Sequence, residues 1–255
     1  MFAVLSPAKK LDFCSLDAEL PHTQPRFQSD TEQLLKKTRT LSSRKLQDLM
    51  GISEALGTLN QERFQQIELP VSPDKGKQAA LAFAGDTYTG LDAPSLSSDD
   101  LAFAQNHLGI LSGFYGLLRP MDLIQPYRLE MGTRLQTRRG KDLYAFWGDR
   151  IRKQIEAEVS KHQTPVLVNL ASKEYFKATC PKDLGLRTVT PNFYEMRPNG
   201  PKMISFLAKK ARGMMARYMI TNRIEDPEGL KAFDLDGYVY DPDGSEPDHW
   251  RFVRG

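Results

Sequence analysis

Positive charge is concentrated between residues 196 and 224, in a pattern that favours anion binding. This stretch holds seven Lys and Arg residues and neither Asp nor Glu. Solvated helix faces usually mix both signs, so charge of one sign is typical of a surface that attracts anions, with a polyanion such as DNA as the natural partner. The alternative is an ordinary solvated helix face, and the stretch taken alone leaves both interpretations open.

Two elements are expected to present these cations. The nearly all-apolar run at residues 203–208 contains neither Gly nor Pro and predicts a buried strand. Beyond it, apolar residues recur at helical spacing and predict a helix that packs through one side. The cations then lie along the border of that side. Those assigned to DNA or anion binding are Lys209, Lys210, Arg212 and Arg217.

Further polar residues lie in or near stretches that predict strands. Lys9 comes soon after residues 2–5, and Lys173 comes after residues 165–171. Ligands of α/β sheets collect outside the carboxyl ends of strands, so both lysines are candidates for anion binding, although Lys9 also fits a solvated loop. Three other residues are candidates for catalysis: Asp86, Tyr88 and Asn169. If these groups converge, they form a cationic pocket with one carboxylate, which could hold a phosphate or a flipped base.

Two arginines border a dense apolar stretch at residues 108–118 that is expected to be buried. Arg119 has Asp122 nearby in sequence, and Arg128 has Glu130. An arginine in such a position usually pairs with an acid, and recognition of an oxyanion is the alternative for both. We retain Arg128 as a candidate for DNA or anion binding.

The helical region at residues 28–67 contains a pattern typical of a helix–hairpin–helix. Gly51 is expected to end one apolar helix, and Ser53 is expected to cap the next. Such a turn directs free backbone N–H groups and a helix dipole towards a DNA phosphate, so Gly51, Ile52 and Ser53 are candidate contacts. The usual hairpin has Gly in the third position, where this chain has Ser53. Two packed helices joined by a turn are the alternative.

Composition sets broad limits on the protein. With 255 residues, 40% hydrophobic residues and a net charge of +3, the chain is expected to form one globular domain whose basic surface is local. Cys14 and Cys180 lie far apart, which fits a reducing cytoplasm, and two buried, inert thiols are expected, with a redox-active thiol as the alternative. No segment reaches membrane-spanning length. The four histidines show no ligand spacing, so we expect no metal and no cofactor, and direct binding of iron is a third possibility with little support.

Other patterns predict the elements that position these residues. Residues 142–160 predict one amphipathic helix, and residues 79–84 predict a short strand. Ser29 and Ser97 each begin a capping-box pattern. Strands are expected at residues 2–5, 165–171 and 188–196, and residues 238–253 predict a hairpin.

Several motifs together identify a family resemblance that runs from Ser6 into the strand at Tyr238. They are Ser6-Pro-Ala-Lys9, Gly85-Asp-Thr-Tyr-Thr-Gly-Leu91, Leu111-Ser-Gly-Phe-Tyr-Gly-Leu-Leu-Arg-Pro120, Pro126-Tyr-Arg-Leu-Glu-Met131, Asn169-Leu-Ala-Ser172 with Glu174-Tyr-Phe176, and Lys209-Lys-Ala-Arg-Gly213. This set resembles the peroxide stress resistance protein YaaA family. Because the motifs are long and occur in order, the resemblance is specific.

The resemblance implies a fold and a setting. The fold is a single α+β domain spanning residues 1–255, with a central mixed β-sheet surrounded by helices and unlike the common superfolds. The setting is a bacterial cytoplasmic protein linked to oxidative stress and DNA protection. The family resembles a group of double-stranded DNA binders with a positively charged cleft and a helix–hairpin–helix. By position, the hairpin falls on Gly51-Ile52-Ser53, and the cleft includes Lys9, Arg128, Lys209, Lys210 and Arg212.

Two functions follow as hypotheses. In the first, the protein binds the backbone of duplex DNA through the Gly51 hairpin and the helix at residues 209–217, without strong base readout. In the second, it is an enzyme that acts on a nucleobase, a nucleotide or another small anionic metabolite, with Asp86 as acid or base. The residues contain no recognisable catalytic motif, so whether the protein is an enzyme stays open at this point.

Overall fold

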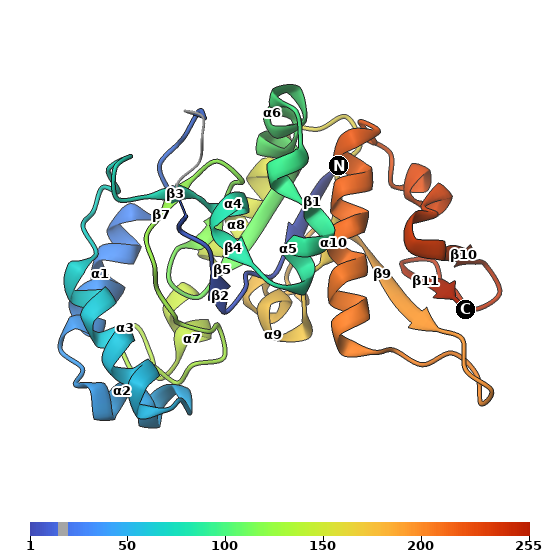
Figure 1. Ribbon diagram of the computed structural model, residues 1–255. Coiled ribbons are helices and arrows are strands. Elements are labelled where there is room, and N and C mark those ends of the chain that lie inside the picture. Colours follow the sequence, from blue (N-terminus) through green and yellow to red (C-terminus); the bar gives the residue numbers. More distant parts are fainter. Residues whose placement is uncertain (15–19) are drawn as a thin grey trace.

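A seven-stranded sheet forms the centre of the molecule, as the computed structural model shows for residues 1–14 and 20–255 (Figure 1). Its strand order is β10-β11-β9-β8-β1-β5-β6. The five inner strands pair in parallel, whereas β10 and β6 pair antiparallel at the two edges. The strand bounds are β1 Phe2–Leu5, β5 Leu108–Ser112, β6 Gly116–Leu118, β8 Val166–Leu170, β9 Arg187–Glu195, β10 Val239–Asp241 and β11 His249–Arg254. The expected α+β fold with a central mixed sheet is therefore confirmed.

Three neighbouring strands of the sheet, β8, β1 and β5, have the composition of strands that are covered on both faces. All residues of these three strands are buried, as expected for parallel strands that are covered on both faces. In the sheet register, Val4 of β1 lies between Gly109 of β5 and Asn169 of β8. The residues that follow β1 and β8 therefore emerge side by side at one edge of the sheet.

Helices surround this sheet, and α1 to α3 gather at one end of the molecule (Figure 1). The bounds of the α-helices are α1 Gln28–Arg39, α2 Ser43–Met50, α3 Glu54–Gln66, α4 Ala79–Ala82, α5 Asp86–Leu91, α6 Ser98–His107, α7 Leu143–Trp147, α8 Arg150–Val159, α9 Lys173–Phe176 and α10 Ser205–Thr221. Two small strand pairs complete the fold: β2 Lys10–Leu11 with β4 Phe83–Ala84, and β3 Lys77–Gln78 with β7 Leu123–Ile124.

The predicted strand at residues 203–208 is wrong, because α10 begins at Ser205. Met203 and Phe206 are exposed, with Phe206 at 58%. A short apolar run fits a strand or a helix equally well, and here it continues into the helical spacing of the residues that follow. The cations from Lys209 to Arg217 are therefore presented by one long helix, and residues 203–208 contain no strand.

Three other predicted elements also need correction. The predicted strand at residues 79–84 consists of α4 followed by the two-residue β4. The predicted helix at residues 142–160 is divided into α7 and α8, because Gly148 takes a left-handed φ of 52° and ends α7. Ser29 forms no cap, since α1 already begins at Gln28, whereas the capping box of Ser97 with Asp100 is formed.

The two cysteines differ from the prediction of buried thiols. Cys14 is exposed, so that prediction is wrong for Cys14. Cys180 is partly buried, and its Sγ donates to the carbonyl oxygen of Gly148 at 3.3 Å. Burial raises the pKa of the Cys180 thiol above its ordinary value, because the thiolate loses hydration.

Close packing of α5 against α10 is the feature that positions the site. A Cβ atom added to Gly213 would lie 1.8 Å from the carbonyl oxygen of Thr87, and one added to Gly90 would lie 2.1 Å from that of Lys210. Both distances are far below a normal contact, so the two helices approach closely only because both positions are glycine. This approach sets the first turn of α5 beside the amino-terminal half of α10.

Candidate functional site

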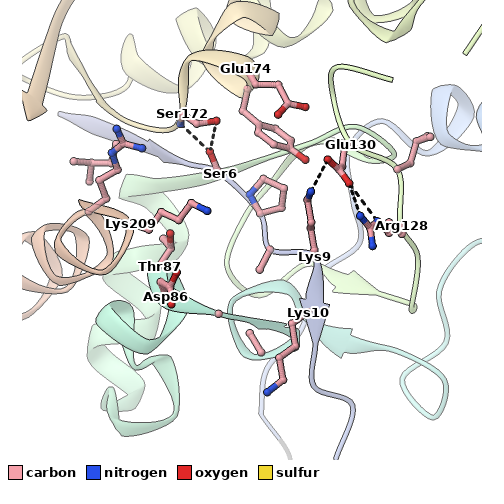
Figure 2. Close-up of a pocket in the computed structure, with 18 of the residues that line it drawn as sticks. Ser6, Lys9, Lys10, Asp86, Thr87, Arg128, Glu130, Ser172, Glu174 and Lys209 are labelled. Atoms are coloured by element: carbon pink, nitrogen blue, oxygen red, sulfur yellow. Dashed lines mark hydrogen bonds and ion pairs between the residues drawn. The ribbon is translucent and has the colours of Figure 1, made fainter. Parts of the chain in front are cut away.

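A cavity of about 440 Å³ opens at the carboxyl ends of β1 and β8 (Figure 2). Ser6 follows β1 and Ser172 follows β8, and the backbone N–H of Ser172 donates to Oγ of Ser6 at 2.9 Å. The Ser6 hydroxyl donates in turn to Oγ of Ser172 at 3.3 Å. These bonds hold two neighbouring strand ends together, at the position where α/β sheets commonly bind ligands.

Charged side chains from distant parts of the sequence converge on this pocket. Cations outnumber carboxylates in its lining by five to three. The cations are Lys9, Lys10, Arg128, Lys209 and Arg212, and the carboxylates are Asp86, Glu130 and Glu174. The predicted convergence therefore occurs for four of the predicted cations and for Asp86, and the pocket favours a negatively charged ligand.

Glu130 neutralises two of these cations. Its Oε2 atom lies 3.0 Å from Nζ of Lys9, and its Oε1 atom lies 3.0 Å from Nη2 of Arg128 (Figure 2). The ion pair expected for Arg128 is thus formed, and so is the pair of Arg119 with Asp122 at 2.8 Å. Only Arg128 of these two arginines lines the pocket, where an incoming anion would compete with Glu130 for it.

Three lining cations, Lys10, Lys209 and Arg212, have no carboxylate partner among the described residues, and two of them, Lys209 and Arg212, come from α10. Within residues 1–14 and 20–255, no carboxylate oxygen lies within 4.0 Å of any of these three side chains. Arg212 is partly buried, and this burial lowers the pKa of its guanidinium below the ordinary value, because the charged form loses hydration. A bound anion would compensate that lost hydration with charge-assisted hydrogen bonds.

Asp86 lines the same pocket from α5, the helix that packs against α10. It is the first residue of α5 and is exposed. Figure 2 shows Lys209 extending from α10 towards the start of α5, where Asp86 and Thr87 lie. A carboxylate accepts hydrogen bonds and a lysine donates them, so this part of the pocket can bind a ligand that carries both an anion and a donor.

The other two candidates for catalysis do not line the pocket. The Tyr88 hydroxyl is buried and donates to the carbonyl oxygen of Ser6 at 3.0 Å, and burial raises the pKa of this phenol well above its ordinary value. Asn169 accepts from the N–H of Ala171 at 3.0 Å and donates to Oγ1 of Thr190 at 3.4 Å. Both side chains bond to backbone groups just after strands, Tyr88 after β1 and Asn169 after β8, and neither is part of the pocket lining.

Three predicted cations also lie outside the pocket. Lys210 is 3.4 Å from Oδ2 of Asp236. Arg217 donates to the carbonyl oxygens of Leu91 and Asp92 at 3.1 and 2.9 Å, and so caps the end of α5. Lys173 is exposed at the start of α9. The cations of α10 therefore do not form one continuous surface, because successive positions project in different directions around the helix.

The predicted hairpin residues connect α2 and α3. Gly51 ends α2 in the left-handed conformation, at φ 62° and ψ 45°, and Oγ of Ser53 accepts from the N–H of Leu56 at 3.4 Å. Both local predictions are confirmed. Gly51, Ile52 and Ser53 are not part of the pocket lining, and α2 and α3 lie at the far end of the molecule from α10 (Figure 1).

Some lining residues were not predicted as site residues. Ser6, Lys10, Ser172 and Glu174 belong to this group. Ser6 and Ser172 each follow a fully buried apolar strand, which was the available signal. Nothing local in the sequence distinguishes Lys10 and Glu174 from solvated residues.

The fold and the pocket define a mixed α+β protein with a cationic site at the carboxyl edge of a parallel sheet core. The chain belongs to the peroxide stress protein YaaA family, whose model matches residues 1–244. A UPF0246 protein of Roseobacter denitrificans is 52% identical over 256 residues, covering 100% of this chain and 98% of the relative. A UPF0246 protein of Alteromonas mediterranea is 53% identical over 254 residues, with the same coverage. One from Dechloromonas aromatica is 48% identical, covering 100% of this chain and 99% of the relative.

Within residues 1–14 and 20–255, no helix is both long and apolar enough to cross a bilayer.

Proposed function

We propose that this protein binds the phosphate backbone of DNA as part of the bacterial peroxide stress response. The observation that carries the proposal is the pair Arg212 and Lys209, which project into an open pocket without a carboxylate partner among the described residues. DNA supplies closely spaced phosphates, the partners that such cations lack. The family name supports the link to peroxide stress.

The hairpin between α2 and α3 is the second contact in this proposal. Gly51 leads into Ser53 and the start of α3, where backbone N–H groups and the helix dipole favour a phosphate. Contacts of this kind hold a duplex without reading its bases. Because the hairpin and the pocket lie in different parts of the molecule, loss of one leaves the other able to bind.

A double substitution tests the pocket contact. The Lys209→Ala/Arg212→Ala variant should bind two duplexes of unrelated sequence more weakly by the same factor, on the order of a hundredfold, because each charge-assisted hydrogen bond contributes about 1.5–3 kcal/mol. Fluorescence anisotropy with labelled duplexes measures this loss. Lys36→Ala, which removes an exposed charge from α1, is the matched control. Unchanged affinity in the double variant would contradict the proposal.

A second candidate function is favoured by Asp86. A protein that only binds backbone phosphates needs no carboxylate in its pocket, whereas an enzyme acting on a nucleobase or nucleotide could use Asp86 as acid or base. Chromatography of mononucleotides and oligonucleotides after incubation with the protein tests this idea. Product that forms with the parent and not with Asp86→Asn supports an enzyme. Identical substrate recovery from the parent and from a protein-free sample argues against one.

A further inference from the structure

We propose that the pocket receives a single nucleotide unit, with its phosphate on Arg212 and Lys209 and a donor group of its sugar or base on Asp86. This inference rests on the proposed DNA binding and names the part of the nucleic acid that enters the pocket. The ligand has two sources that share this chemistry: a free mononucleotide, or a nucleotide extruded from a DNA strand.

The size of the cavity is the first argument. At about 440 Å³ it falls in the range of sites that enclose one small molecule. An intact duplex is much too wide to enter such a cavity, so backbone binding alone leaves its interior unused. A single nucleotide is a ligand of suitable size.

The arrangement of charge is the second argument. Arg212 and Lys209 come from α10, whereas Asp86 begins α5, and the glycines Gly90 and Gly213 allow the backbones of these two helices to pack closely. The site therefore presents donors and an acceptor at fixed positions. A ligand that satisfies both must carry a hydrogen-bond donor close to its anion. Nucleotides have such donors in their sugar hydroxyls and base N–H groups, and the phosphates of a duplex have none.

The remaining lining is the third argument. Pro7, Ala8, Tyr127, Leu129 and Tyr175 give the pocket an apolar and aromatic wall. Tyr127 and Tyr175 are buried at 5% and 9% exposure, so the wall is held in place by the core. An apolar wall beside a few fixed polar groups is typical of sites that bind a planar base by contact with its faces. A free phosphate ion would not use this wall.

Calorimetry tests whether the pocket binds a free mononucleotide. Deoxynucleoside 5′-monophosphates should bind the parent at least about tenfold more tightly than the matching nucleosides or inorganic phosphate, because only they engage both ends of the site. Asp86→Asn and Lys209→Ala should each weaken this binding about tenfold, through loss of one charge-assisted contact. Both side chains are exposed, so these variants are expected to fold, and Lys36→Ala should bind like the parent.

Fluorescence of 2-aminopurine tests whether the pocket binds a nucleotide extruded from a DNA strand. A duplex that carries one mispaired 2-aminopurine should brighten several-fold on binding the parent, because the base leaves the stack. The rise should be absent with Asp86→Asn, although this variant still binds the duplex. Selective nucleotide binding without the rise assigns the pocket to free nucleotides, and the rise assigns it to extruded ones.

Failure of this inference is distinguishable from failure of the proposed function. Suppose that calorimetry shows no preference for mononucleotides and that 2-aminopurine shows no fluorescence rise, while Lys209→Ala still weakens duplex binding. The nucleotide site is then wrong, and backbone binding stands. If Lys209→Ala leaves duplex binding unchanged, the proposed function itself fails. Equal binding of mononucleotides by the parent and by Asp86→Asn would also overturn the role given to Asp86.

Discussion

The pocket and the hairpin are both candidates for binding phosphate, but they are built in opposite ways. The hairpin uses one continuous segment, in which Gly51 ends α2 and Ser53 caps α3. The pocket uses residues from distant segments, including Lys9 after β1, Asp86 on α5 and Arg212 on α10. The hairpin depends on local conformation, whereas the pocket depends on the packing of the whole sheet and its helices. Substitutions that disturb packing should therefore impair binding by the pocket and leave binding by the hairpin intact.

Of the substitutions that separate the pocket from the hairpin, Gly213→Ala should have the largest effect, on both stability and DNA binding. The added Cβ would lie 1.8 Å from a backbone oxygen of α5, so the two helices must move apart. We expect a loss of stability of about 1–3 kcal/mol or more, and a melting temperature lower by roughly 2–4 °C for each kcal/mol. The pocket should lose its DNA contact because Asp86 and Arg212 are no longer held at their positions.

Differential scanning calorimetry and anisotropy measure the two consequences. Gly185→Ala is the control, because no atom lies within 4 Å of the added Cβ there. A Gly213→Ala protein that melts and binds like the parent would show that the contact between α5 and α10 does not position the site.

Glu130→Gln should have the next largest effect, in the opposite direction. The change removes the charge that neutralises Lys9 and Arg128. Duplex affinity should rise about tenfold at low salt, equivalent to about 1.4 kcal/mol, and the gain should shrink as salt increases. Anisotropy titrations at two salt concentrations measure it.

Glu68→Gln is the matched control for this change, since Glu68 pairs with Lys75 and does not line the pocket. An equal gain in duplex affinity in both variants would mean that the net charge of the protein causes the gain, and that the pocket has no special role in it.

Gly51→Ala should have the smallest effect, confined to the hairpin. No atom lies within 4 Å of the added Cβ, so the cost comes from the left-handed φ of 62° and amounts to about 1–2 kcal/mol of stability. Loss of the helix-dipole contact should weaken duplex binding about twofold to fivefold, since such contacts contribute about 0.3–1 kcal/mol.

Nucleotide binding in the pocket should be unchanged by this substitution, because Gly51 is not part of its lining. Calorimetry with a mononucleotide checks this point. A parallel loss of nucleotide binding would show that the hairpin and the pocket are coupled.

The same contrast explains how much could be predicted from the sequence. The turn at Gly51, the cap at Ser97 and the buried strand at Phe2–Leu5 depend on neighbouring residues, and all three were predicted correctly. The strand proposed at residues 203–208 failed because a six-residue apolar run does not distinguish a strand from the start of a helix.

Convergence in the site was only partly predictable. Lys9, Asp86, Arg128, Lys209 and Arg212 were predicted and do line one pocket. Lys210 and Arg217 were placed with them, but they project elsewhere and meet Asp236, Leu91 and Asp92. The direction of a side chain around a helix is set by which face of the helix packs. In α10 this face contains Gly213, which packs against the backbone of α5, a segment far away in the sequence.

The salt dependence of duplex binding tests the role of the pocket most directly. The association constant should be measured at several salt concentrations for the parent and for Lys209→Ala/Arg212→Ala. If Arg212 and Lys209 each neutralise one phosphate, the slope of log K against log salt should become shallower by about 2 in the variant, at about 0.9 per phosphate. Parallel slopes for the two proteins would show that these cations do not contact the DNA backbone, and would contradict the account.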